Sequence, residues 1–256
     1  MASHHIALAA GADIAGFRDA TRRLLASQVP PNDVTWDAHG GTSLFGGDAT
    51  GDAKACVLPR GVVELIHDAV CHRDPQRYAH CYALIWRVQQ GERALLDVAS
   101  DPLIHRLLML RKAVRRDIHK MHAFLRYRDA GAENFVAWYE PEHFILEAVA
   151  SFFVERFGSL IWSIVTPIGS LHWDRETLTI GGPGVRADVP PHDAFESAWR
   201  KYYESVFNPA RTNPVAMRRH MPKKYWHNMP ETAAIPTLLS EATTRVEAMV
   251  QMEPKP

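Results

Sequence analysis

Four ionisable residues near the middle of the sequence could carry acid–base chemistry. His119 lies in a long helical pattern, and Glu140, Glu142 and His143 follow in the phrase WYEPEH. Carboxylates near cations or inside a closed pocket acquire the shifted pKa values that general acids and bases need. A helix dipole alone would also favour Glu142 in a first helical turn. Catalysis by these four residues is one hypothesis, and ordinary surface charge is the alternative.

Metal chemistry has weaker support in the same region. His119 and His122 are three apart on one helical face, but the spacing is not the His-Glu-x-x-His of zinc proteases. The three cysteines, Cys56, Cys71 and Cys81, form no Cys-x-x-Cys pair, which zinc deaminases require. We therefore predict no metal and no cofactor, and we expect the cysteines to be reduced thiols in the core.

Phosphate binding is the second kind of chemistry that the sequence suggests. The formal net charge is zero, yet residues 102–128 and 199–228 hold 15 of the 29 Lys and Arg residues. Their only acids are Asp117 and Glu204. If the two segments pack together, they form a positive face that neutralises phosphates. Two ordinary solvated helix faces are the alternative. The predicted phosphate contacts are Arg115, Arg116, Lys120, Arg126, Arg211, Arg218, Arg219, Lys223 and Lys224.

The second basic segment also carries aromatic residues. Residues 217–226 interleave cations with Tyr225 and Trp226. Such side chains can hold backbone phosphates while they stack on unpaired bases. Both aromatic residues could equally anchor a terminal helix in the core, and for Trp226 we favour that role.

These residues must be positioned by a long helix and a sheet. Apolar residues recur at spacings of three and four from Pro102 to Leu125, which predicts one long amphipathic helix with a basic ridge beside its apolar stripe. Strand patterns follow at 135–139, 160–166, 170–174 and 177–180, with a helix at 141–157. The predicted fold class is α+β: helix-rich, with the long amphipathic basic helix packed on a small, mostly antiparallel sheet.

The first hundred residues predict a mixed region with helices dominating. We expect a short strand at 5–8, a helix capped by Asp13, a strand at about 56–58 and helices at about 61–72 and 75–90. The glycine-rich run 40–51 has no complete phosphate-binding motif, so we expect a plain loop. The predicted division is a mixed α/β N-terminal region at 1–100 and an α+β C-terminal domain at 101–256. No clear linker separates them, so one continuous unit is the alternative.

Several functional classes have no support in the sequence. The apolar runs are too short to cross a bilayer, and the N-terminus lacks the pattern of a secretory signal. We therefore expect a cytoplasmic protein without a membrane partner. No Gly-x-Ser-x-Gly elbow is present, which argues against a standard hydrolase triad.

Five phrases together resemble a known bacterial family. They are CHRDP at 71–75, KAVRRDIHKM at 112–121, AWYEPEH at 137–143, FNPAR at 207–211 and MPKKYW at 221–226. They resemble a family catalogued as a probable DNA metabolism or repair protein, whose C-terminal part is a domain of unknown function. The resemblance covers nearly the whole chain.

The resemblance implies a context and no mechanism. In that family the unit is often fused to a uracil-DNA glycosylase-like domain or encoded beside a putative radical-SAM DNA repair protein, and no catalytic residue is established. The chain ends at Pro256, so the resemblance implies a stand-alone form that works with a separate partner. The leading hypothesis is a DNA-binding accessory protein of DNA repair or DNA metabolism. The alternatives are an enzyme on damaged DNA or a nucleotide, and a protein adaptor without DNA contact.

Overall fold

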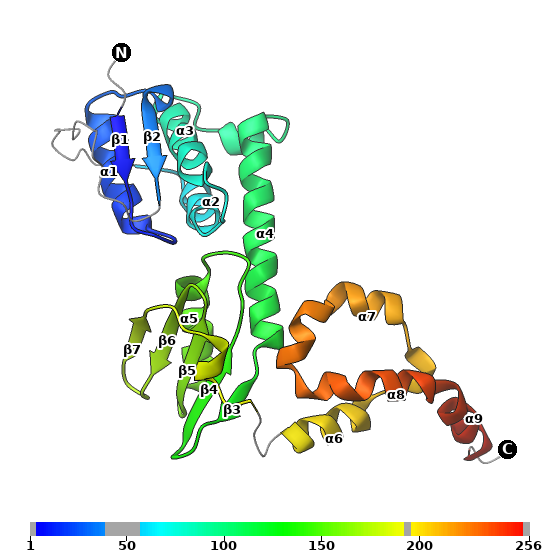
Figure 1. Cartoon of the computed structure of the whole chain (residues 1–256). Helices are drawn as coiled ribbons and strands as arrows, with labels where there is room; N and C mark the ends of the chain where they lie inside the picture. Colours follow the sequence, from blue (N-terminus) through cyan, green and yellow to red (C-terminus); the bar gives the residue numbers. More distant parts are fainter. Residues whose placement is uncertain (1–3, 39–56, 192–195, 253–256) are drawn as a thin grey trace. The chain divides into compact units, whose positions relative to one another are not determined.

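The computed structural model describes residues 4–38, 57–191 and 196–252, and it divides the chain into two compact units (Figure 1). The first unit comprises Met1–His119 and Pro141–Val149, and the second comprises Lys120–Glu140 and Ala150–Pro256. The chain therefore passes between the units three times. None of the helices in the described residues is long and apolar enough to cross a membrane.

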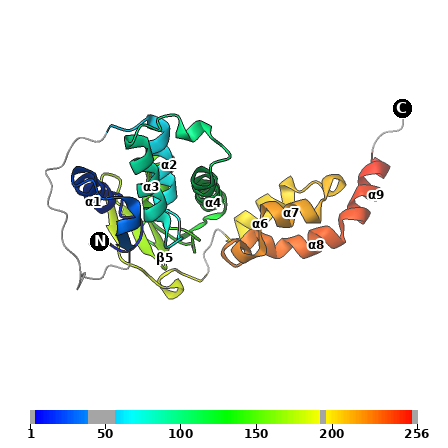
Figure 2. The ribbon, with the colours of Figure 1, turned by 90° about the horizontal axis from the view of Figure 1, so that it is seen from above.

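The first unit surrounds a short parallel sheet with helices. Strands β1 and β2 pair in parallel, with Ile6 opposite Trp36. Helix α3 contacts α1, α2 and β2, and Figure 2 shows α2 and α3 side by side. The elements are β1 (His4–Ala7), α1 (Ile14–Ala26), β2 (Val34–Asp37), α2 (Arg60–Val70), α3 (Arg77–Gln89) and the first part of α4 (Pro102–Phe124).

Aromatic side chains and the apolar stripe of α4 form the core of this unit. The Phe17 ring lies 5.1 Å from that of Trp36 and 5.3 Å from that of Tyr78, measured between centroids. Ile104 and Leu107 of α4 are fully buried in the same core. The three-and-four spacing that predicts α4 thus places the first part of its apolar stripe in the first unit's core.

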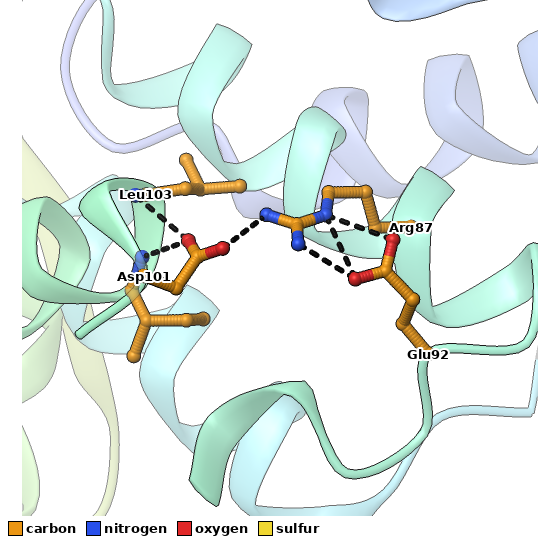
Figure 3. Close-up of polar contacts among 5 residues, drawn as sticks. Arg87, Glu92, Asp101 and Leu103 are labelled. Carbon is orange, nitrogen blue, oxygen red and sulfur yellow. Dashed lines mark hydrogen bonds and ion pairs between the residues drawn. The ribbon is translucent and has the colours of Figure 1, made fainter. Parts of the chain in front are cut away.

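A side-chain network fixes the start of α4 (Figure 3). The Asp101 carboxylate accepts hydrogen bonds from the backbone N–H groups of Leu103 at 2.9 Å and Ile104 at 3.2 Å. The Arg87 guanidinium at the end of α3 binds that carboxylate at 2.8 Å and the Glu92 carboxylate at 2.6 Å. Asp101 is therefore an N-cap whose orientation is held by the preceding helix.

The second unit contains a mixed five-stranded sheet in the order β3-β4-β5-β6-β7. Three of its four pairings are antiparallel, and β4 pairs with β5 in parallel. Because a parallel pair needs a crossover, α5 connects these two strands. The elements are β3 (Tyr127–Asp129), β4 (Asn134–Trp138), α5 (Leu146–Phe157), β5 (Ile161–Thr166), β6 (Gly169–Trp173) and β7 (Leu178–Gly181).

Aromatic residues join α5 to this sheet. Phe153 of α5 and Trp162 of β5 are both 1% exposed, with ring centroids 6.2 Å apart. The His122 ring stacks on Phe152 at 3.8 Å between centroids. His122 thus serves in packing.

Short helices complete the second unit. The 3-10 helix η6 contacts α6, and Figure 2 shows α6 beside α8. Tyr225 is buried, and its ring stacks on that of Tyr139 at 5.6 Å and lies 5.3 Å from that of Phe124. The elements are α6 (Glu196–Val206), α7 (Pro214–His220), α8 (Ile235–Ser240), α9 (Ala242–Met252) and the 3-10 helices η3 (Arg186–Asp188), η4 (Pro209–Arg211), η5 (Lys223–Asn228) and η6 (Pro230–Ala234).

The α+β class is confirmed, and so is the mostly antiparallel character of the larger sheet. Two local predictions were wrong: the helix predicted from Pro141 begins only at Leu146, and Val57 and Leu58 lie outside any strand. Strands β2 and β3 were not predicted. The glycine-rich run 40–51 and Cys56 lie outside the described residues. Cys71 and Cys81 are buried free thiols.

Candidate functional site

The four predicted acid–base residues lie in different environments. His119 and Glu142 are exposed in the first unit, whereas His143 there is 8% exposed. Glu140 belongs to the second unit, where its carboxylate lies 3.3 Å from Nε2 of His227 and both side chains are about half exposed. His143 is the one of the four that is buried.

His143 lies against the turn between α2 and α3. Its ring centroid is 4.2 Å from that of His72, and its Nδ1 accepts a hydrogen bond from the backbone N–H of Arg73 at 3.4 Å. The Nδ1 of His72 accepts from the backbone N–H of Asp74 at 2.9 Å. Since both Nδ1 atoms act as acceptors, both rings carry their proton on Nε2 when neutral.

Three further hydrogen bonds hold residues 141–144 in this place. The carboxylate of the buried Asp117 accepts from the backbone N–H of His143 at 2.9 Å. The Phe144 N–H donates to the Cys71 carbonyl at 2.8 Å, and the Arg73 guanidinium donates to the Pro141 carbonyl at 3.2 Å. In a helix from Pro141 the Ile145 N–H would donate to the Pro141 carbonyl, but here it donates to the His143 carbonyl at 3.0 Å, and α5 starts later.

The surroundings keep His143 uncharged. Burial, together with His72, Arg73 and Arg116, lowers the pKa of His143 to about 4. Burial also lowers the pKa of His72, although Asp74 opposes the shift. The pair is therefore neutral at neutral pH. We define His72, Arg73, Asp117 and His143 as the histidine junction.

A buried arginine extends the junction toward α1. Arg77 is 3% exposed, and it donates to the carbonyl of Gly11 at 2.7 Å and to that of Asp74 at 3.2 Å. Its guanidinium lies 4.4 Å from the Tyr78 ring centroid and 5.1 Å from that of Phe144. Most hydrogen bonds of the junction thus connect backbone groups to parts of the chain that are distant in sequence. This arrangement points to a role in holding these parts of the first unit together. No group of three or more His, Cys, Asp or Glu residues suited to a metal occurs among the described residues.

Some predicted phosphate contacts are already engaged within the protein. Arg115 is exposed but lies 2.8 Å from the Asp68 carboxylate, and Arg116 is exposed beside it. Arg126 binds the buried Glu231 carboxylate at 2.7 Å. Lys120 donates to the carbonyl of His220. Arg126 and Lys120 therefore attach the helical segment after α6 to residues 120–126 of the same unit.

The remaining cations gather in a short stretch of the second unit. We define the basic segment as Arg218, Arg219, Lys223 and Lys224, which lie in α7 and η5 and are all exposed. Arg211 in η4 is also exposed. Within the described residues, neither Arg211, Arg218, Arg219 nor Lys223 forms an ion pair. An exposed cation without an internal carboxylate remains available to an external anion.

The two lysines of the basic segment each lie over an aromatic ring. The Lys224 ammonium lies 4.8 Å from the ring centroid of the buried Tyr225, and the Lys223 ammonium lies 5.8 Å from that of Trp226. The Trp226 indole N–H donates to the carbonyl of Met221 at 3.0 Å. Tyr225 is the core anchor that the sequence allowed, while Trp226 is only partly buried.

One comparison with known proteins found a match. A family described as a domain of unknown function, DUF4130, matches residues 75–231, which is more than half of the chain. The chain belongs to the DUF4130 family. No curated protein and no solved structure matches it.

The DUF4130 match contains most of the residues described above. It includes Asp117, His143 and the basic segment, and it begins just after His72 and Arg73. His72 and Arg73 were not predicted as site residues, because they lie some 70 positions from His143 in the sequence. The phrase CHRDP at 71–75 contains both and was noted only for its resemblance to a family. The DUF4130 description carries no activity, so any function must be argued from the side chains.

Proposed function

We propose that the protein is a DNA-binding accessory factor of DNA repair or DNA metabolism, whose principal phosphate contacts are made by the basic segment. The observation that carries the proposal is that Arg218, Arg219 and Lys223 are exposed and form no ion pair within the described residues. Phosphate neutralisation dominates nonspecific affinity for nucleic acid. A protein of zero net charge can bind DNA if its cations are segregated in this way.

The anchoring of the segment supports this proposal. Tyr225 is buried between Phe124 and Tyr139, and Lys120 holds the carbonyl of His220. These contacts limit the motion of Lys223 and Lys224, which lie between His220 and Tyr225, so less conformational entropy is lost when phosphates bind. Arg115 and Arg126 contribute less in our proposal because each has an internal carboxylate.

The partner is part of the proposal and rests on the family resemblance. We expect the protein to act in the cytoplasm beside a uracil-DNA glycosylase-like or radical-SAM repair protein. Tyr202 and Val206, one turn apart on α6, are 61% and 57% exposed and could contribute to such a contact. The enzyme alternative, through His119, Glu140, Glu142 and His143, stays a prediction, as does an adaptor without DNA contact.

The test is fluorescence-anisotropy binding to single-stranded, duplex and uracil-containing oligonucleotides at about 50 mM and about 200 mM salt. We expect affinity to fall steeply with added salt. The triple variant Arg218→Ala, Arg219→Ala, Lys223→Ala should reduce the slope of log affinity against log salt by about 2 to 3.

A matched control comes from the same unit. Arg175 and Arg245 are also exposed, but each is 2.8 Å from a carboxylate, of Glu133 and Glu241 respectively. The double variant Arg175→Ala, Arg245→Ala should leave the salt slope unchanged. Equal slopes for the triple variant and the native protein would refute the proposal, as would the absence of binding to any of the three oligonucleotides.

A further inference from the structure

A pocket lined by three arginines and a tryptophan lies beside the basic segment in the second unit. It has a volume of about 660 Å³ and opens between η3, α6, η5 and η6. This volume falls in the range of pockets that hold small organic molecules. The side chains that matter for the argument are Arg128, Arg186, Glu196, Arg200, Trp226 and His227.

Positive charge dominates the wall of this pocket. Arg128 is 7% exposed, with its guanidinium bound to the carbonyls of Pro190 and Pro191 and 3.6 Å from the Glu196 carboxylate. Glu196 is the one carboxylate among the described wall residues, against three arginines. The pocket therefore has a net positive lining that an anionic ligand would complement.

Repulsion between two of the arginines supports the same conclusion. Burial and the charge of Arg128 lower the pKa of Arg186, and only Glu140 opposes the shift. Arg186 still carries its charge at neutral pH. Two guanidinium groups that disfavour each other's charge are relieved when an anion with several acceptor oxygens binds between them.

An aromatic wall completes the pocket. Trp226 lines it while Lys223 of the basic segment lies over the same indole ring at 5.8 Å. The pocket and the basic segment are thus joined through one residue. Aromatic faces stack on nucleobases regardless of sequence, and arginines beside them hold the backbone phosphate.

We propose that this pocket takes one nucleotide of single-stranded DNA, with the base against Trp226 and its phosphate at Arg186 and Arg200. The inference rests on the proposed function, because the basic segment would deliver the strand. It goes further in naming an unpaired nucleotide as the ligand. A base inside a duplex could not reach the pocket without leaving its stack.

The experiment uses single variants with a matched neighbour. Arg200→Ala removes an exposed pocket arginine, and Lys201→Ala removes the next cation on α6, which does not line the pocket. Binding is measured with fluorescent single-stranded and duplex oligonucleotides and with 2-aminopurine deoxyribonucleoside monophosphate, whose fluorescence falls on stacking. Trp226→Leu serves as a second variant, with circular dichroism to confirm folding.

Arg200→Ala should weaken single-strand binding about tenfold and leave duplex binding within about twofold, because its phosphate contact is lost only at the pocket. Trp226→Leu should weaken single-strand binding about tenfold and duplex binding less, because the indole also contacts Lys223 of the basic segment. Lys201→Ala should match the native protein. The mononucleotide should bind to the native protein and to the Arg218, Arg219, Lys223 triple variant, but more weakly to Arg200→Ala.

Three outcomes separate the pocket from the proposed function. Equal single-strand binding by Arg200→Ala and Lys201→Ala, without mononucleotide binding, overturns the pocket even if the basic segment binds DNA. Mononucleotide binding that Arg200→Ala weakens upholds the pocket even if no oligonucleotide binds. If poly-glutamate displaces the single-stranded oligonucleotide and the mononucleotide does not, the pocket binds an acidic protein segment and the proposal is overturned.

Discussion

At the scale of single residues, Asp117 has the most demanding position. It is 3% exposed, yet it carries a carboxylate that accepts the backbone N–H of His143. Without that carboxylate the N–H would remain buried and lose its partner. We expect Asp117→Ala to lower the free energy of unfolding by about 1–3 kcal/mol, measured by urea denaturation.

The neighbouring exposed histidine provides the control for this prediction. His119→Ala, two positions along the same helix, should change the free energy of unfolding by less than about 0.5 kcal/mol. Equal effects of the two variants would show that the Asp117 hydrogen bond does not organise the junction.

His143 predicts a pH dependence of stability. Its folded-state pKa is about 4, against 6.5 in the unfolded chain. Between these values the unfolded chain binds the proton and the folded protein does not, so stability falls as pH decreases from 6.5 to 4. The contribution is at most about 1.4 kcal/mol per pH unit.

The measurement is urea denaturation of the native protein and of His143→Asn at several pH values between 7 and 4.5. The asparagine side chain can still accept a hydrogen bond but does not titrate. The native protein should lose more stability than the variant on acidification. Parallel pH profiles would contradict the assignment of a neutral, buried His143.

The sequence identified part of this junction. His143 was a candidate because its phrase combines a histidine with two glutamates. Asp117 was noted as one of the two acids within residues 102–128 and 199–228. The hydrogen bond between Asp117 and His143 spans 26 positions, and the ring contact between His143 and His72 spans 71. Local patterns carry no information about contacts at such separations, so the junction became visible only in the fold.

At the scale of elements, the start of α4 depends on a residue outside the helix. Asp101 caps the first turn, and Arg87 orients its carboxylate. Asp101→Ala should lower the free energy of unfolding by about 1 kcal/mol, since that is the usual value of an N-cap. Thermal or urea unfolding monitored by circular dichroism gives the measurement.

Asp101→Asn distinguishes the cap from the ion pair. Asparagine caps helices as well as aspartate does, but it carries no charge for Arg87. We expect this variant to retain most of the stability at neutral pH. A loss as large as that of the alanine variant would mean that the charge, and not the cap, determines the effect.

The element with the longest regular pattern was predictable, whereas the short strands were predicted only in part: β1, β6 and β7 were expected and β2 was not. The apolar spacing from Leu103 to Leu125 predicts α4 because a 23-residue helix repeats the pattern many times. Strand β2 has four residues, and its pairing with β1 is remote in sequence. The start of α5 was misplaced because the N–H groups of His143 and Phe144 donate to Asp117 and Cys71, which are remote in sequence, and the Ile145 N–H donates to the His143 carbonyl and not to that of Pro141.

At the scale of the whole molecule, the first unit is built from two separate stretches of sequence. Ile104, Leu107 and Leu110 of α4 belong to its core, and residues 141–149 contribute His143 to the histidine junction. A division of the chain at residue 100 stays a prediction. From this core we expect a fragment of residues 1–100 to unfold without a cooperative transition.

The comparison fragment is residues 1–149, which contains every part of the first unit. It should show a cooperative transition in urea, because its core is complete. Cooperative unfolding of the shorter fragment would show that the side chains of α4 are dispensable for this core.

The return of residues 141–149 to the first unit also affects the order of events during synthesis. The ribosome delivers the chain at about 5–20 residues per second, so the stretch from His119 to Val149 emerges over roughly 2 to 6 s. During that interval the nascent first unit lacks the strip that carries His143 and Phe144. The apolar surface that this strip covers stays exposed to chaperones until then. The covering residues, 141–149, are synthesised only after β3 and β4 of the second unit.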